Sequence, residues 1–67
     1  MKISYNRLWK LLIDKNMKKI DLCKLTHISS SSIAKLTKNE NVNTDILVRI
    51  CEALSCKLED IMELTEK

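Results

Sequence analysis

Residues 17–36 decide the fold, and they read MKKIDLCKLTHISSSSIAKL. Leu22 and Cys23 lie on one face of a predicted helix over residues 19–26, and charged side chains occupy the other face. His27 then stands where a tight turn between helices would ordinarily use glycine, and histidine is among the residues enriched at positive φ. The pattern predicts a short helix that ends in a sharp turn at His27.

A second helix is predicted to follow from the serine cluster to about Thr37. Ser29 is a suitable N-cap, Ile33 and Leu36 form an inward pair at i and i+3, and Asn39 can end the segment in the left-handed conformation. The serine run is also compatible with a flexible linker, but it is short and lies between two periodic apolar segments. The outward side chains of this helix are then Ser30, Ser31, Ser32 and Lys35.

Helical spacing of apolar residues continues on the N-terminal side of this stretch. Residues 6–16 form a predicted helix with one apolar stripe for the core and a second stripe that contains Trp9 and Ile13. We expect the second stripe to cover a chain terminus or to contact another copy of the protein.

The C-terminal part predicts a longer helix, capped by Asn43 or Thr44, and one last helical turn over residues 58–62. Ile3 can pair with residues 62–64 as a very short ribbon. The expected fold is all-α: one domain, residues 1–67, built as a compact bundle of about five short helices. Its predicted core comprises Leu8, Leu11, Met17, Leu22, Cys23, Ile28, Ile33, Leu36, Leu47, Ile50, Cys51, Leu54, Leu58 and Ile61.

Composition and charge exclude several classes of protein. The chain has no Gly and no Pro, which excludes a Gly-rich phosphate loop, and its 3% aromatic content excludes an aromatic platform for single strands. Residues 1–39 hold nine Lys and Arg against two Asp, a net +7, whereas residues 40–67 hold three against seven, a net −4. This asymmetry favours a polyanionic partner on one face. No apolar run is long enough for a membrane span and no secretory leader opens the chain, so we expect a cytoplasmic location.

The pattern of cysteine and histidine residues predicts neither a catalytic site nor a metal site. Three cysteines cannot pair completely within one chain, and we interpret them as reduced structural thiols. A metal site built from Cys23, His27 and Cys51 or Cys56 is disfavoured because no CxxC pair accompanies them. With one His and no apposed carboxylate pair, we expect no enzyme, no cofactor and no small-molecule ligand.

The two helices predicted within residues 19–37 have the shape that can enter a DNA major groove. Apolar residues pin the second helix on one side, and its other side presents short polar groups. Residues 17–36 resemble the helix-turn-helix of Xre-like regulators, the Cro and phage-repressor type, which have a lambda-repressor-like DNA-binding domain. Residues 42–61 resemble that family's closing helices, and segments 8–13, 38–42 and 50–54 resemble short bacterial members such as VanU-type regulators. Cys23, His27 and Asn39 depart from the family pattern, which has Ala, Gly and Gly there.

The resemblance implies roles for individual residues. Lys19 matches a position that holds a phosphate, and Ser30, Ser31 and Lys35 match positions that face base edges. Ser32, Lys38 and Asn39 match positions near the DNA backbone. Because serine satisfies several bases, we expect Lys35 to discriminate most and phosphate contacts to carry much of the affinity. The candidate DNA-binding residues are Lys19, Ser29, Ser30, Ser31, Ser32, Lys35, Lys38 and Asn39.

The favoured hypothesis is a sequence-specific transcriptional regulator that binds double-stranded DNA as a homodimer on a two-fold symmetric operator. Trp9 and Ile13 are the preferred dimer contacts, ahead of Met62 and Leu64. The alternative is a protein-interaction module that keeps the helix-turn-helix shape and binds a partner regulator or a toxin.

Overall fold

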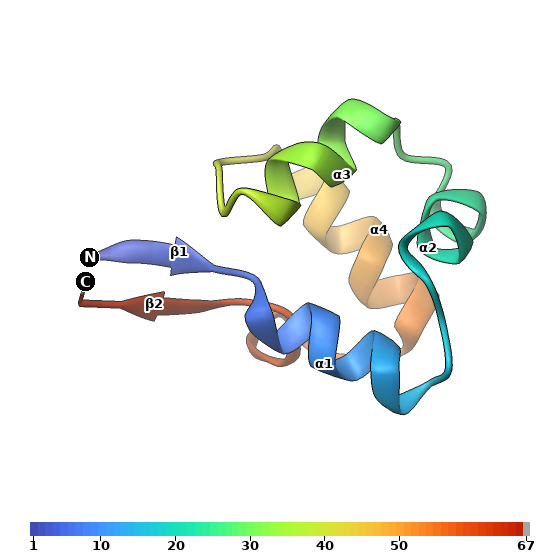
Figure 1. Ribbon diagram of the computed structural model, residues 1–67, viewed down its shortest axis with the longest axis horizontal. Helices are drawn as coiled ribbons and strands as arrows, with labels where there is room; N and C mark the ends of the chain where they lie inside the picture. The colour runs from blue at the N-terminus through green and yellow to red at the C-terminus, as the bar shows by residue number, and fades with distance from the viewer. Residues whose placement is uncertain (67) are drawn as a thin grey trace.

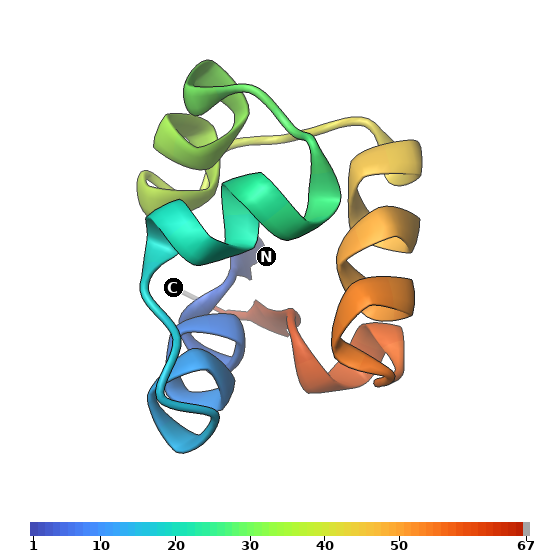
Figure 2. The same cartoon turned by 90° about the vertical axis from the view of Figure 1, so that its right-hand side faces the viewer.

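Four α-helices enclose the core, and a two-stranded antiparallel ribbon pairs the two ends of the chain (Figure 1). The computed structural model describes residues 1–66. Figure 2 shows the sharp turn between α2 and α3, with α4 running along a separate side of the molecule. The elements in chain order are β1 (Lys2–Ser4), α1 (Asn6–Asp14), α2 (Lys19–Thr26), α3 (Ser30–Thr37), α4 (Thr44–Leu54), the 3₁₀ turn η1 (Leu58–Asp60) and β2 (Glu63–Thr65).

The predicted all-α helix-turn-helix fold is confirmed, while the count of helices needs correction. Helix α2 begins at Lys19 and ends at Thr26, and Ser29 caps α3, as the sequence predicts. The fifth helix is only the three-residue 3₁₀ turn η1, because the chain enters β2 almost at once. The predicted short ribbon is also present, since Ile3 pairs with Leu64. Within residues 1–66 no helix is long and apolar enough to cross a membrane.

The core lies between the four helices and follows the predicted stripes with three differences. Leu58 is predicted to lie inside but is 51% exposed, because η1 turns its first residue outward and Ile61 takes the inward place. Leu12 and Tyr5, absent from the predicted core, are buried. Leu11, Met17, Cys23 and Cys51 are half-buried at its edge. The buried apolar residues are Tyr5, Leu8, Leu12, Leu22, Ile28, Ile33, Leu36, Leu47, Ile50, Leu54 and Ile61.

Every α-helix is followed by a left-handed residue, although the chain contains no glycine. Positive φ closes a helix because it lets the next N–H groups bond back to the last free carbonyls. After α4, for example, Cys56 donates to the Cys51 carbonyl at 3.0 Å across Ser55. Non-glycine side chains make this conformation costlier. The four left-handed residues are Asn16, His27, Asn39 and Ser55, of which the sequence predicts His27 and Asn39.

The turn between α2 and α3 offers a direct test, because His27 has φ 59°. We expect His27→Gly to raise the free energy of unfolding by up to about 1 kcal/mol, since glycine adopts this φ without a Cβ clash. In a domain of this size that corresponds to a rise in Tm of roughly 4 °C. His27→Ala is the matched variant, and it should lower Tm. Equal Tm values for the two variants in thermal unfolding would show that the backbone conformation is not the constraint.

Candidate nucleic-acid interface

Helix α3 is held by one narrow apolar stripe, and the rest of its surface is open to solvent except at Ser32, which is half-buried. Ile33 and Leu36 are buried to 9% and 0% exposure. Ser30, Ser31 and Lys35 are exposed, as the sequence predicts for side chains that face a ligand. The helix therefore cannot rotate about its axis without exposing its apolar stripe, which fixes the direction of its polar side.

The serine cluster forms the N-terminal cap of α3 and is not a flexible linker. The Ser29 hydroxyl accepts from the Ser32 backbone N–H at 3.3 Å and lies 2.9 Å from the Ser31 hydroxyl and 3.1 Å from the Ser32 hydroxyl. The cap satisfies one of the free N–H groups of the first turn. Among the described residues, only the Ser30 hydroxyl of this cluster has no hydrogen-bond partner in the protein. The Ser31 hydroxyl keeps further hydrogen-bonding capacity beside this contact, because a hydroxyl has one donor and two acceptor sites.

Lys19 lies at the start of α2, but its ammonium group is held beside the end of α3. Lys19 Nζ donates to Thr37 Oγ1 at 3.0 Å and lies 4.5 Å from the centre of the Trp9 ring. Thr37 Oγ1 in turn donates to the Ile33 carbonyl at 3.0 Å. A cation over an aromatic face is attracted by the negative face of the ring. Trp9 thus supports a positive charge next to α3, a role that sequence reasoning did not assign to it.

Tyr5 connects the loop after α3 to the N-terminal ribbon. The Tyr5 backbone N–H donates to Asn39 Oδ1 at 3.0 Å, and its hydroxyl donates to the Glu40 carbonyl at 3.0 Å. Tyr5 is 1% exposed, and burial raises the pKa of its hydroxyl above the ordinary value of 10.0. Asn39, expected near the DNA backbone, therefore uses its side-chain oxygen within the protein. Sequence reasoning missed Tyr5, and its only signal was a lone aromatic residue just before a helix.

The positive charges around α3 are not neutralised by protein carboxylates. In residues 1–66 the ion pairs are Arg7 with Glu63 and Arg49 with Asp45, each at 3.1 Å. Lys19, Lys35 and Lys38 are all exposed and take part in neither. A face with unpaired lysines attracts phosphates, and this attraction weakens as salt rises. The site therefore combines a helix whose polar side has a fixed direction with lysines that form no ion pair within residues 1–66.

The cysteines are all free thiols in the described chain. Cys51 and Cys56 lie together at the end of α4, and burial together with the neighbouring Cys51 raises the pKa of the Cys56 thiol above 9.0. No group of three or more His, Cys, Asp or Glu side chains within residues 1–66 is placed to hold a metal ion. Cys23 and His27 therefore belong to no metal-binding cluster in this part of the chain.

Comparison with known proteins agrees with this geometry. A family model described as a Cro/C1-type helix-turn-helix DNA-binding domain matches residues 7–67. The chain belongs to this Cro/C1-type family. Among solved structures it is similar to the crystal structure of the transcriptional regulator VanUg, form II, with a TM-score of 0.92 and 53% sequence identity over 97% of this chain and 88% of that chain. A search of curated proteins found no match. The predicted resemblance to Xre-like and VanU-type regulators is confirmed.

The family assignment identifies α2 and α3 as the helix-turn-helix of a Cro/C1-type DNA-binding domain. In a helix-turn-helix the second of the two helices is the one that enters the major groove. The three departures from the family pattern are tolerated by this fold. Cys23 is half-buried like a small apolar residue, and His27 and Asn39 adopt the left-handed conformation that glycine would supply.

The exit from α3 can be tested at Asn39, which combines φ 58° with the bond to Tyr5. Asn39→Gly keeps the left-handed conformation and removes only the acceptor, so we expect a loss of about 1 kcal/mol in the free energy of unfolding. Asn39→Ala removes the acceptor and adds backbone strain, for a loss of about 2 kcal/mol. Urea unfolding measures both. Indistinguishable midpoints for the two variants would contradict a left-handed requirement at this position.

Proposed function

We propose that this protein is a sequence-specific transcriptional regulator that binds double-stranded DNA with α3 in the major groove. The observation that carries the proposal is the exposed polar side of α3, which is pinned by Ile33 and Leu36 and flanked by unpaired lysines. The similarity to VanUg, a transcriptional regulator by its printed name, supports the same conclusion.

Each part of the site has a distinct task in this proposal. Lys35 is one helical turn beyond Ser31 on the exposed side and contacts a base edge, with guanine O6 and N7 as the preferred acceptors. Ser30 and Ser31 add short, permissive hydrogen bonds. Lys19 and Lys38 hold phosphates near the C-terminal end of the helix. Ser29 and Ser32 lie at its N-terminus, where free N–H groups favour an anion. Asn39 lies near the backbone and orients the loop.

Lys19 is well suited to phosphate binding because its ammonium group is already localised. The Trp9 ring and Thr37 Oγ1 hold the group near the end of α3 before DNA arrives. A preorganised side chain loses less conformational entropy on binding than a free one. Thr37 can then release Lys19 to a phosphate while the cation stays over the ring.

DNA binding is tested by titrating a labelled duplex, selected from a random library by the purified protein, at several salt concentrations. We expect the logarithm of the binding constant to fall linearly with the logarithm of salt concentration. The double variant Lys19→Ala, Lys35→Ala should bind at least tenfold more weakly, since a base contact by Lys35 alone is worth about 1–3 kcal/mol.

The matched control is the double variant Lys15→Ala, Lys57→Ala, which removes the same charge at the end of α1 and before η1. It should bind within about twofold of the unmodified protein, since exposed charges distant from the interface are largely screened. Equal weakening by the two double variants would contradict the placement of the site on α3. Absence of binding to any duplex at low salt would overturn the function and favour a protein-interaction module.

We also propose that the protein binds a two-fold symmetric operator as a homodimer. Two recognition helices one helical turn apart, about 34 Å, match successive major grooves on one side of the duplex. Ile13 is 72% exposed and lies one turn from the half-buried Trp9 on α1, so this surface offers apolar area for a second copy. Leu64 on β2, the other candidate from the sequence, is 60% exposed.

The dimer surface is tested by sedimentation equilibrium with and without DNA. We expect Ile13→Ser to shift the protein towards monomer and to reduce cooperative binding to the full operator, because it removes apolar area from the interface. Leu64→Ser is the matched variant and should leave the oligomeric state unchanged. Dissociation by Leu64→Ser alone would place the interface at β2, against this proposal.

A further inference from the structure

The C-terminal end of α4 brings two cysteines together, and the proposed function uses neither of them. The helix closes with a Schellman motif, in which the N–H group of the second residue after the helix donates back to a carbonyl of the last turn. Here Cys56 donates to the Cys51 carbonyl at 3.0 Å, and Ser55 donates to the Glu52 carbonyl at 3.4 Å. The side chains at the two ends of this motif often make an apolar contact, and in this chain both are cysteines.

The two thiols are close enough to affect each other. Burial raises the pKa of the Cys56 thiol above 9.0, and the neighbouring Cys51 thiol raises it further. Both residues are free thiols and half-buried. Cys23, the third cysteine, lies on α2 and has no part in this shift. The pair is therefore defined by the backbone motif and by the mutual effect of the thiols.

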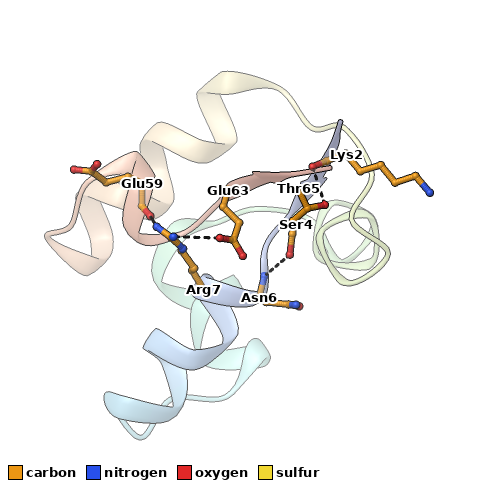
Figure 3. A network of polar contacts seen from close by, with 7 residues as sticks. All are labelled: Lys2, Ser4, Asn6, Arg7, Glu59, Glu63 and Thr65. Carbon is orange, nitrogen blue, oxygen red and sulfur yellow. Dashed lines mark hydrogen bonds and ion pairs between the residues drawn. The ribbon is translucent and has the colours of Figure 1, made fainter. Parts of the chain in front are cut away.

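The chain that follows Cys56 is anchored to the rest of the protein. Arg7 on α1 donates to the Glu59 carbonyl at 2.9 Å and pairs with Glu63 at 3.1 Å, as Figure 3 shows. Ile61, between these two contacts in the sequence, is completely buried. Cys56 cannot move far from α4 without breaking these contacts, so the two thiols are held near each other in the free protein.

A hollow of about 300 Å³ gives solvent access to the pair. Cys51 and Cys56 both line it, together with the exposed apolar side chains of Val48 and Leu58. A charged molecule loses hydration when it enters apolar surroundings, and a neutral one loses much less. The carboxylate of Glu52, which also lines the hollow, further disfavours an anion. The hollow is therefore suited to a small neutral reagent.

We propose that Cys51 and Cys56 form a reversible dithiol–disulfide site, at which a neutral hydroperoxide oxidises the pair to an intramolecular disulfide across the end of α4. The thiolate of one cysteine attacks the O–O bond, which gives a sulfenic acid and releases an alcohol, or water when the oxidant is hydrogen peroxide. The second thiol attacks that sulfur, the S–S bond forms, and the hydroxyl group leaves as water with the thiol proton. The two electrons lost by the sulfurs reduce the peroxide.

This site is independent of the proposed DNA-binding function. A low-molecular-weight thiol reverses the reaction by thiol–disulfide exchange, so the modification is not a terminal lesion. Thiolate is the reactive form, and the raised pKa of Cys56 keeps this thiol largely protonated at neutral pH. We therefore expect oxidation to be slow, and its course is followed over hours.

The experiment treats the full chain with hydrogen peroxide, blocks the remaining thiols with iodoacetamide and maps the tryptic peptides by mass. Trypsin cleaves after Lys and Arg, so peptide 50–57 contains both cysteines of the pair and peptide 20–24 contains Cys23. We expect peptide 50–57 to lose the mass of two hydrogen atoms and to carry no blocking group. Peptide 20–24 should carry one. Dithiothreitol added before the blocking step should restore two blocked thiols in peptide 50–57.

Two variants serve as controls, and thermal unfolding shows whether each is folded. Cys23→Ser should form the disulfide at the same rate as the unmodified protein, and Cys56→Ser should not form it. The rate should not change when the protein is diluted, because the two thiols belong to one chain. The inference would be overturned if both thiols of peptide 50–57 in the unmodified protein stayed open to blocking or only gained oxygen. A disulfide from this peptide to peptide 20–24 or to a second chain would overturn it as well.

Discussion

Burial of Tyr5 is the interaction on which the arrangement of this surface depends. Tyr5 fills the core at the point where β1 meets α1, and its two hydrogen bonds reach 34 and 35 residues along the chain to the loop after α3. A buried aromatic ring with both polar groups satisfied is a strong local constraint, because losing either partner leaves a desolvated group unpaired. The loop, the ribbon and the end of α3 are thereby held in one geometry.

Charge is distributed so that the surface around α3 stays positive. Ion pairs in the described chain involve arginines and lie at the ribbon and along α4, whereas the lysines around α3 remain unpaired. Lys19 is held by an aromatic ring and a hydroxyl, which position the ammonium group without cancelling its charge. A surface built in this way keeps its attraction for polyanions while limiting the freedom of the groups that make the contact.

Much of the fold could be predicted from the sequence because its signals are local. Apolar spacing predicts the bounds of α2, and a serine before an apolar helix predicts the cap of α3. The same reasoning fails at Leu58, since a single 3₁₀ turn has a different period from the α-helix that the pattern predicts. It also misses Leu12, because α1 is apolar over adjacent stripes and only packing selects the one that faces the core.

Part of the candidate site could likewise be predicted from the sequence, and part could not. The exposed side of α3 follows from its own periodicity, so the sequence is sufficient to place Ser30 and Lys35 on it. It is not sufficient for the use of Asn39 by Tyr5 or the support of Lys19 by Trp9, since each joins residues that are far apart in the chain. Sequence alone thus determined the four α-helices, the ends of α2 and α3 and the family, because capping and periodicity act within one or two turns. Tertiary structure decided which polar groups stay free and how Tyr5 joins the N-terminal ribbon to the loop after α3, because burial and long-range hydrogen bonds exist only once the chain has closed on itself.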